Sequence, residues 1–521
     1  MSAQERVTDN QPRHVSSSSI LIWAGRSLTG RQVVLLALVL SVLVMIAHRP
    51  LIRSAGGDTA VYDYVAQSIL RGQVPYRDVV DIKFPGAAHL SALAMFVFKP
   101  FGIRDLIAVR ILNVILVALL EIIIFLVGLA YLGRIDAAVI GLLFPLMSPR
   151  FLDWMVGGTE PKLPLMVFGM LTLLLIAWDR PFWAGFSSML ACLCWQPGLM
   201  FTGVAVLIFS RYLTSWRDLR ALKALAGAAI PLAVTFGYFY LRGALGDLWA
   251  WTITYNYSVF GPMAERSVSD SLDHLYKVTS RVLDGNNLVV IASIIGFAIM
   301  LVERITMKFK PGDSNRSTEL FKDAILFPPL IYFVFCLINF QAGPDLIPFI
   351  PFVGIFAAKA IIELCLQLQR IKKYPVLWDV AMPRLAIVVM VLTVLVRAVT
   401  FRPDGGTIAE QDKAFKIISE NLGPNDQIYT HGTTELLVLF NKPNLSPYVF
   451  LDYGADDFAA SRRGVDFNQI IEEMDAKSPK IIALSRMKVV THRGDFKNWV
   501  DEKYTPLEVP GYDGIYIRNS N

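Results

Sequence analysis

Long apolar segments recur along almost the whole chain of 521 residues. They include residues 33–47, 107–132, 163–177, 289–302 and 385–399. A helix crosses the hydrocarbon core of a bilayer with about 20 apolar residues. Only 18% of the residues are charged, against about 25% in an average soluble domain. The sequence therefore predicts a polytopic α-helical membrane protein, and topology signals explain its net charge of +6 without a nucleic-acid partner.

Lysine and arginine gather in four segments, residues 6–31, 211–223, 304–322 and 370–373. Such clusters mark the cytoplasmic side of a membrane protein. About eleven crossing helices put all four clusters on that side. These helices are expected at 32–48, 106–131, 136–154, 163–178, on either side of 195–198, and at 222–241, 286–302, 323–340, 346–366 and 382–400. The apolar piece 87–98 is too short to cross comfortably, so it is predicted to lie at the membrane surface.

The expected crossing helices divide the chain into three parts. Residues 1–31 are expected to be a disordered cytoplasmic tail, and residues 32–402 a transmembrane module with an external loop at 49–105. Residues 403–521 are expected to be an extracytoplasmic α/β domain, because helical and strand-like runs alternate there. The expected helices are 408–423, 466–477 and 493–503, and the expected strands are 427–432, 447–451, 480–485 and 514–518. His431 and His492 are expected to be ordinary polar positions of this domain.

The external loop begins with an apparent helix over residues 59–72, whose apolar residues repeat every four positions. Asp58 stands before this helix in the N-cap position, and Gly72 is placed to end it. A carboxylate at a corner of this kind stays partly exposed, so capping and a functional role are compatible. The preceding Gly56 and Gly57 would let another group approach closely.

The rest of the loop, residues 75–86, is bracketed by two prolines and is not helical. It contains Arg77, Asp78, Asp81 and Lys83. One interpretation is a solvated loop with weak local ion pairs. The other is a surface that binds an anion, with Lys83 as the point charge. The residue types alone leave both interpretations open.

Several motifs together carry a family resemblance. They are Asp58 directly after the first crossing helix, the string A-x-x-I-L-x-G-x-x-P-Y-R-D-V-x-D-x-K-x-P-G over 66–86, "GGTEP" at 157–161, and "CLCWQPGL" at 192–199. With the α/β tail, they resemble the GT-C glycosyltransferases that use lipid-linked sugars, in particular bacterial relatives of protein O-mannosyltransferases and aminoarabinose transferases. The layout is similar over nearly the whole chain, and residues 58–86 are its most specific part.

The resemblance implies that Asp58 is the catalytic carboxylate, that Glu160 is a second acidic residue of the site, and that Lys83 contacts the donor phosphate. The donor would be a polyprenyl-phosphate sugar, whose anomeric carbon is attacked by an acceptor hydroxyl. A general base contributes about 10²–10⁴-fold to such a step, and a cation stabilises the departing phosphate. The acidic residues could instead hold a divalent cation, Mg or Mn, through oxygen ligands. Relatives differ in their metal requirement, so no cofactor is assigned.

Four further residues are candidates for substrate binding: Arg77, Asp81, Gln196 and Asp345. Gln196 is also explained by packing at the corner between two helices, and Asp345 by capping the helix at 346–366. Glu160 could likewise be an ordinary loop carboxylate. Two departures from the family pattern leave the donor and the metal open. Thr59 stands where many relatives have a second acid, and no aromatic or basic residue marks the segment "AGPDLIPFIP" at 342–351.

The predicted function is transfer of a hexose or pentose from a polyprenyl-phosphate donor to a glycan, lipid or protein acceptor, at the outer face of the cytoplasmic (inner) membrane. A transporter or flippase of a lipid-linked or small substrate is the alternative. Transporters place ionisable groups at mid-membrane and often contain repeats. Here few ionisable residues lie in the middle of the expected helices, and Glu121 is the exception. A third interpretation is a non-catalytic scaffold whose outer domain binds a partner.

Overall fold

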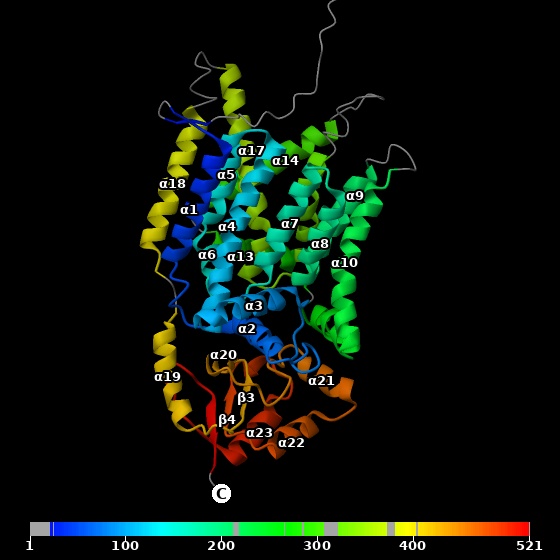
Figure 1. Cartoon of the computed structure of the whole chain (residues 1–521), viewed down its shortest axis with the longest axis vertical. Helices are drawn as coiled ribbons and strands as arrows, with labels where there is room; N and C mark the ends of the chain where they lie inside the picture. Colours follow the sequence, from blue (N-terminus) through cyan, green and yellow to red (C-terminus); the bar gives the residue numbers. More distant parts are fainter. Residues whose placement is uncertain are drawn as a thin grey trace, which may run out of the picture.

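The computed structural model describes residues 21–23, 26–211, 218–264, 266–283, 286–306, 321–371, 381–402 and 405–519. Every range expected to cross the membrane contains a helix. The helices of the bundle are α1 (Gly30–Ala47), α4 (Asp105–Leu132), α5 (Ile135–Met147), α6 (Pro149–Met155), α7 (Lys162–Ala177), α8 (Pro181–Cys194), α9 (Leu199–Arg211), α10 (Arg220–Leu241), α14 (Asn287–Thr306), α16 (Phe327–Asn339), α17 (Ile350–Ile371) and α18 (Met382–Thr400). They stand side by side in the upper part of Figure 1.

Within the described residues, seven helices are long and apolar enough to cross a membrane. The pair α5 and α6 makes an eighth span if it is counted as one, with a bend of 68° between its halves. The bend falls at Pro149, which cannot donate a helical backbone hydrogen bond. Helices α7 and α8 are shorter but also apolar. The chain is therefore a multi-pass helical membrane protein, as predicted.

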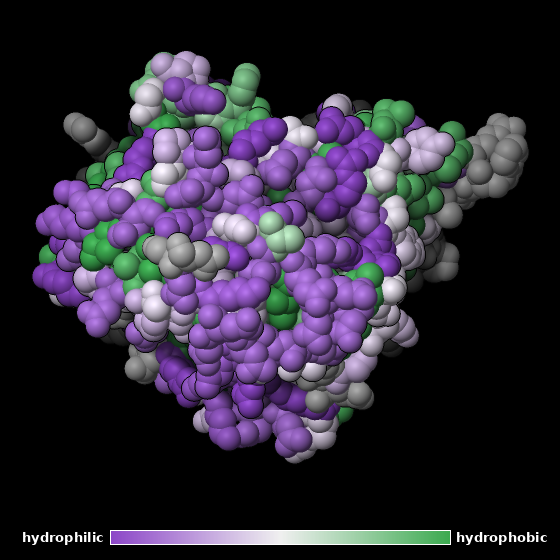
Figure 2. Space-filling view, turned by 90° about the horizontal axis from the view of Figure 1, so that it is seen from below, coloured by the Kyte–Doolittle hydropathy of each residue, from purple (hydrophilic) through white to green (hydrophobic). Residues whose placement is uncertain are grey.

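The outer helices of the bundle expose large apolar side chains, which is the expected surface against lipid. In α14 only 17% of the most apolar window is buried, and Leu288 and Ile305 are among its exposed residues. Helix α18 is similar, with 22% of its window buried. By contrast, Figure 2 shows a mostly hydrophilic surface at the end of the molecule that carries the C-terminal domain. This contrast separates a lipid-facing side from a water-facing end.

The described residues of the basic clusters lie at helix ends on the side of the bundle opposite the C-terminal domain (Figure 1). Arg211 is the last residue of α9, Arg220 is the first of α10, and Arg304 lies in the last turn of α14. Arg211 and Arg304 both pair with Asp323, at 2.8 and 2.6 Å. The remaining cluster positions in 6–20, 212–217, 307–320 and 372–380 lie outside the described residues, as does most of the expected tail. Of that tail, β1 (Leu21–Trp23) and β2 (Arg26–Leu28) form an antiparallel pair.

Two short helices lie crosswise between the bundle and the C-terminal domain (Figure 1): α2 (Gly57–Leu70) and α3 (Gly86–Phe98). Helix α3 has 13 residues and covers the apolar piece predicted not to cross the membrane. Helix α2 begins two residues before its expected start at residue 59, with Gly56 as N-cap. The predicted N-cap role of Asp58 is therefore wrong. Gly57 has a left-handed backbone, with φ of +61°, which favours glycine, and the helix starts at this residue.

The C-terminal domain is an α/β domain, as predicted. Its elements are α19 (Ile408–Glu420), β3 (Ile428–His431), α20 (Glu435–Phe440), α21 (Ala455–Arg463), α22 (Phe467–Ala476), β4 (Ile481–Leu484), α23 (Arg493–Lys503), β5 (Tyr504–Pro506) and β6 (Ile515–Arg518). The strand order is β3-β4-β6-β5, with β3 and β4 parallel and the other pairs antiparallel. In the register, Ile428 lies beside Ile481.

Residues 447–451, expected to be a strand, are irregular, and this prediction is wrong. Val449 is fully buried, and its carbonyl accepts one hydrogen bond, from the N–H of Gly432 at 3.3 Å. The carbonyl of Pro447 accepts another from the N–H of Val80 in the external loop, at 2.9 Å. The apolar residues of this segment therefore fill the core without joining the sheet. Helices α20 and α21 and strand β5 were not expected.

The domain and the membrane module share one apolar core. Tyr64 and Val65 of α2 pack in the same cluster as Leu436 and Leu437 of α20. The Tyr64 hydroxyl accepts a hydrogen bond from the N–H of Asn444 at 2.7 Å. This shared core holds the carboxyl ends of β3 and β4 close to α2, where Asp58 lies.

Candidate active site

Asp58 lies in the first turn of α2 with its side chain 67% exposed. Its Oδ1 atom is 3.1 Å from Nη1 of Arg486, which follows β4 in the C-terminal domain. The same guanidinium reaches Oδ2 of the buried Asp452 at 3.1 Å. The candidate catalytic carboxylate is therefore held by a cation from a segment more than 400 residues away in the chain.

The chain between α2 and α3 returns to the same place and carries Lys83. The Lys83 ammonium lies 4.4 Å from the centroid of the Tyr62 ring, in a cation–π contact. Removal from water lowers the pKa of Lys83, and the nearby Lys162 cation lowers it further. Glu160 and Asp58 act in the opposite direction on that pKa. These charged groups therefore share one region of the molecule.

Asp81 stabilises the turn that presents Lys83. Its Oδ1 atom accepts hydrogen bonds from the N–H groups of Ile82 at 2.6 Å and Lys83 at 3.2 Å. The side chain is nearly fully buried. Burial raises the pKa of Asp81 to about 6, although these N–H donors and the Lys83 charge favour the carboxylate. Its observed contacts belong to the loop itself.

A second lysine lies at the centre of the acidic residues. The ammonium of Lys162, the first residue of α7, is 3.4 Å from Oε1 of Glu160 and 3.5 Å from Oδ1 of Asp345. It also lies 4.8 Å from the centroid of the Trp195 ring. All three charged side chains are at least 87% buried. Asp58, Lys83, Glu160, Lys162 and Asp345 are called the carboxylate–lysine cluster below.

Asp345 stabilises the turn before α17 and also faces Lys162, while its predicted role in substrate binding stays a prediction. Its Oδ2 atom accepts hydrogen bonds from the N–H groups of Gln341 at 2.9 Å and Ala342 at 3.3 Å, at the start of a short 3₁₀ segment, Gly343–Phe349. Its other oxygen faces Lys162. The carboxylate thus fixes the turn before α17 and adds charge to the cluster.

The segment that carries Glu160 is held by buried polar contacts. Oδ1 of Asp63 in α2 accepts hydrogen bonds from the N–H of Thr159 at 3.0 Å and from its hydroxyl at 2.6 Å. Burial raises the pKa of Asp63 to about 6, against the effect of these donors. A Cβ atom on Gly158 would lie 2.4 Å from Oδ2 of Asp63. A side chain at this position would therefore displace the Asp63 carboxylate that holds Thr159.

Arg110 of α4 binds the backbone on both sides of the site. Its guanidinium donates hydrogen bonds to the carbonyls of Pro50, Arg53, Ser54 and Gly157, at 2.6 to 3.2 Å. The residue is completely buried. This one side chain fixes the chain before Asp58 relative to the chain before Glu160.

Gln196 connects the external loop to the helical segment after α10. Its Nε2 atom donates to the carbonyl of Ile82 at 2.9 Å and to that of Thr252 at 3.2 Å. Asn256 donates to the same two carbonyls, at 2.7 and 3.0 Å. Gln196 therefore positions the backbone next to Lys83.

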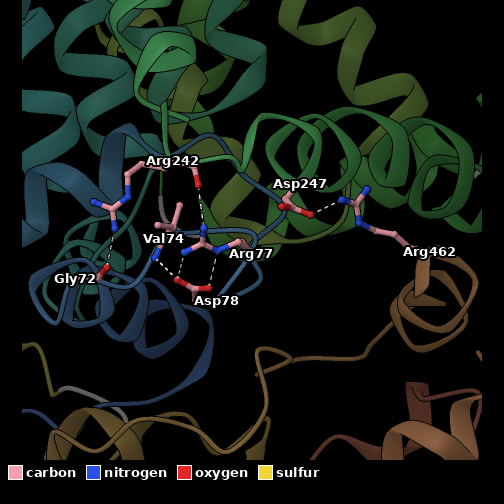
Figure 3. Close-up of polar contacts among 7 residues, drawn as sticks. All are labelled: Gly72, Val74, Arg77, Asp78, Arg242, Asp247 and Arg462. Atoms are coloured by element: carbon pink, nitrogen blue, oxygen red, sulfur yellow. Dashed lines mark hydrogen bonds and ion pairs between the residues drawn. The ribbon is translucent and has the colours of Figure 1, made fainter. Parts of the chain in front are cut away.

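Arg77 lies in a separate polar group of the loop (Figure 3). Its guanidinium pairs with Asp78, with contacts of 2.8 and 3.0 Å, and donates to the carbonyl of Arg242 at 2.9 Å. Asp247 and Arg462 form a neighbouring ion pair between the segment after α10 and α21 (Figure 3). Arg77 thus joins the loop to the end of α10. Its predicted role in substrate binding stays a prediction.

The two histidines of the C-terminal domain have polar partners. His492 contacts Asp495 at 2.9 Å and Asp457 at 2.8 Å, and His431 lies 3.2 Å from Asp452. Among the described residues, no three His, Cys, Asp or Glu side chains are grouped to hold a metal ion. The two carboxylates most suited to a divalent cation, Glu160 and Asp345, already flank the Lys162 ammonium. The divalent cation stays a prediction.

This arrangement can be compared with solved structures. ArnT from Cupriavidus metallidurans, in a crystal structure bound to undecaprenyl phosphate, is similar with a TM-score of 0.61 over 94% of this chain and 98% of that one, at 13% identity. The archaeal oligosaccharyltransferase AglB from Archaeoglobus fulgidus, in complex with an inhibitory peptide and a dolichol-phosphate, is similar with a TM-score of 0.55 over 93% of this chain and 74% of that one, at 11% identity. No protein-family model and no curated protein sequence matches this chain. The chain therefore has the fold of ArnT and AglB, which agrees with the predicted fold.

The structure brings together most of the residues singled out from the sequence, but sequence reasoning missed three that complete the site. Lys162 directly follows the "GGTEP" motif, and its place at the start of an expected helix, two residues after Glu160, was the available signal. Arg110 is an arginine within an apolar helix, which is unusual enough to indicate a buried role. Arg486 had no local signal, because only the tertiary fold brings it to Asp58.

Proposed function

We propose that this protein is a membrane glycosyltransferase that moves a sugar from a polyprenyl-phosphate donor to an acceptor hydroxyl at the outer face of the cytoplasmic membrane. The observation that carries the proposal is the carboxylate–lysine cluster, which combines an exposed carboxylate with two lysines at the water-facing end of a GT-C fold. The bound undecaprenyl phosphate of ArnT and the bound dolichol-phosphate of AglB support a lipid-phosphate donor.

In the proposed step, the acceptor oxygen forms a bond to the anomeric carbon while the bond from that carbon to the donor phosphate oxygen breaks. Asp58 takes the hydroxyl proton, and the polyprenyl phosphate leaves with the bonding electrons. A single displacement of this kind inverts the anomeric centre. Asp58 suits the role of base because its exposed carboxylate can be reached by an acceptor hydroxyl.

Lys83 suits the role of phosphate ligand. Among the described residues no carboxylate lies within ion-pair distance of its ammonium, and its contact is the Tyr62 ring. A partly buried cation with a lowered pKa gains charge stabilisation when an anion binds beside it. The Lys162 ammonium offsets one of the two negative charges of Glu160 and Asp345, which reduces their repulsion of a phosphate in the same region.

The test is sugar transfer in membranes supplied with radiolabelled polyprenyl-phosphate sugars. Wild type, Asp58→Asn and the control Asp273→Asn are compared at equal protein abundance. Asp273 is a 56% exposed acid paired with Lys277 on helix α13 (Val268–Val282), outside the site. We expect loss of a general base to reduce transfer by about 10²–10⁴-fold in Asp58→Asn, with normal transfer in Asp273→Asn.

Full transfer by Asp58→Asn would remove the assigned base. Absence of transfer by wild type with several donors, together with measured movement of a lipid-linked substrate across the membrane, would favour the transporter. Unchanged partner complexes in an inactive protein would favour the scaffold.

A further inference from the structure

A groove of about 660 Å³ opens on the C-terminal domain where β4 ends. Its lining combines apolar side chains, among them Leu484, Met487 and Val489, with two basic ones, Arg486 and Lys488. Asp513 is the acidic residue of the lining. In sheets with parallel strands, ligands commonly bind beyond the carboxyl ends of the strands. Here β3 and β4 are parallel, and the groove lies at the carboxyl end of β4.

The groove is built on a tightly constrained backbone. A Cβ atom on Gly514 would lie 2.1 Å from the carbonyl oxygen of Leu484, and one on Gly432 would lie 2.5 Å from Oγ of Ser485. Arg486 itself has a left-handed backbone, with φ of +58°. Such a conformation is unfavourable for a residue other than glycine and persists where the surrounding structure enforces it, often at binding sites. The contacts on both sides therefore fix the position of Arg486.

Arg486 links the groove to Asp58. One end of its guanidinium contacts Asp58 and the other contacts Asp452, each at 3.1 Å. Asp452 is buried, whereas the side chains of Arg486 and Asp58 are 48% and 67% exposed. The contact with Asp452 anchors the guanidinium, and the contact with Asp58 is open to exchange with a ligand from water. While Arg486 holds Asp58, one oxygen of that carboxylate is occupied by the guanidinium and is not free to accept a proton from an acceptor.

We propose that this groove is the acceptor site, and that a phosphate or similar anionic group on the acceptor binds Arg486 in place of Asp58. Lys488 adds a second positive charge, and the apolar wall packs against the rest of the acceptor. Arginine binds phosphate oxygens through two parallel donors, which favours this exchange. The release of Asp58 then couples acceptor binding to the availability of the base. This inference rests on the proposed function, because it assigns the acceptor of that reaction.

Binding to the purified full-length protein in detergent, measured by isothermal titration calorimetry, tests the groove without requiring transfer. Glucose 6-phosphate represents a soluble anionic acceptor, and dihexanoyl phosphatidic acid represents a lipid headgroup; glucose is the neutral control. The variant Arg486→Asn removes the guanidinium and keeps a residue that tolerates a left-handed backbone. Lys488→Gln alters the second cation, and Arg493→Gln is the control at an exposed arginine of the same domain.

We expect at least one phosphate probe to bind wild type at least tenfold more tightly than Arg486→Asn, with a smaller loss in Lys488→Gln and none in Arg493→Gln. The probe that binds more tightly identifies the source of the anion. Equal binding to wild type and Arg486→Asn, equal binding of glucose, or no binding of either phosphate would overturn the inference. Arg486-dependent binding without sugar transfer would reject the proposed function alone. Transfer without such binding would reject the acceptor site alone.

Discussion

Replacing Lys162 with methionine would test the electrostatic centre of the site. The change keeps an unbranched side chain of similar length and removes the charge between Glu160 and Asp345. Both carboxylates are buried, and their oxygens lie 3.4 and 3.5 Å from the ammonium. Lys162→Met would therefore leave two buried carboxylates without their shared cation.

The size of the effect follows from these distances. Coulomb's law with an effective dielectric constant of about 20 gives an attraction of about 5 kcal/mol for each contact. Removal of the charges from water offsets part of this attraction, so the net value is smaller. Breaking a buried pair by removing one partner destabilises a protein by about 3–5 kcal/mol. We expect Lys162→Met to lose about this much free energy of unfolding.

The assay is thermal unfolding of the purified protein in detergent. We expect a fall in Tm of several degrees for Lys162→Met. The triple variant that adds Glu160→Gln and Asp345→Asn should recover most of the loss, since neutral amides need no cation. Lys277→Met breaks an exposed pair with Asp273 and should change stability by about 0–1 kcal/mol. A Tm for Lys162→Met equal to that of wild type, or no recovery in the triple variant, would refute the reasoning.

Burial raises the pKa of Glu435 to about 7, so the folded protein favours its protonated form, and stability falls as pH rises from about 4.5 to 7. The shift corresponds to about 3 kcal/mol. Glu435→Gln should therefore raise Tm above that of wild type at pH 8 but not at pH 4. The same gain in Tm at both pH values would contradict the role of Glu435 ionisation. A Cβ atom on Gly227 of α10 would lie 1.9 Å from the carbonyl oxygen of Phe182, whereas one on Gly237 would meet nothing within 4 Å. Gly227→Ala should therefore separate α8 from α10 and lower Tm, with little change in Gly237→Ala, and equal Tm values would disprove the close contact. Because Lys162 occupies the space between two carboxylates, we expect EDTA to leave sugar transfer unchanged; loss of transfer that Mg or Mn restores would instead assign the divalent cation.

The helical bundle could be predicted from the sequence because membrane crossing imposes a local rule. A run such as 106–131 must be apolar and must satisfy its own backbone hydrogen bonds, so it reads as one helix, and α4 confirms it. The helix interruptions at Gly72 and Pro149 also depend on the backbone properties of single residues. The strand predicted at residues 447–451 is wrong because a short apolar run fits a strand and a buried irregular segment equally well. Only the neighbouring core decides between the two structures.

The residues of the candidate site also fall into those that the sequence predicts and those that only the fold brings together. The sequence by itself determined that a carboxylate follows the first crossing helix, that Lys83 lies in the same loop, and that Glu160 precedes another helix, because each belongs to a short contiguous motif. Only the tertiary structure decided that Lys162 pairs with both Glu160 and Asp345, and that Arg486 reaches Asp58 from the far end of the chain. Electrostatic interactions depend on distance and burial, not on separation along the chain, so these pairings exist only once the fold has brought the segments together.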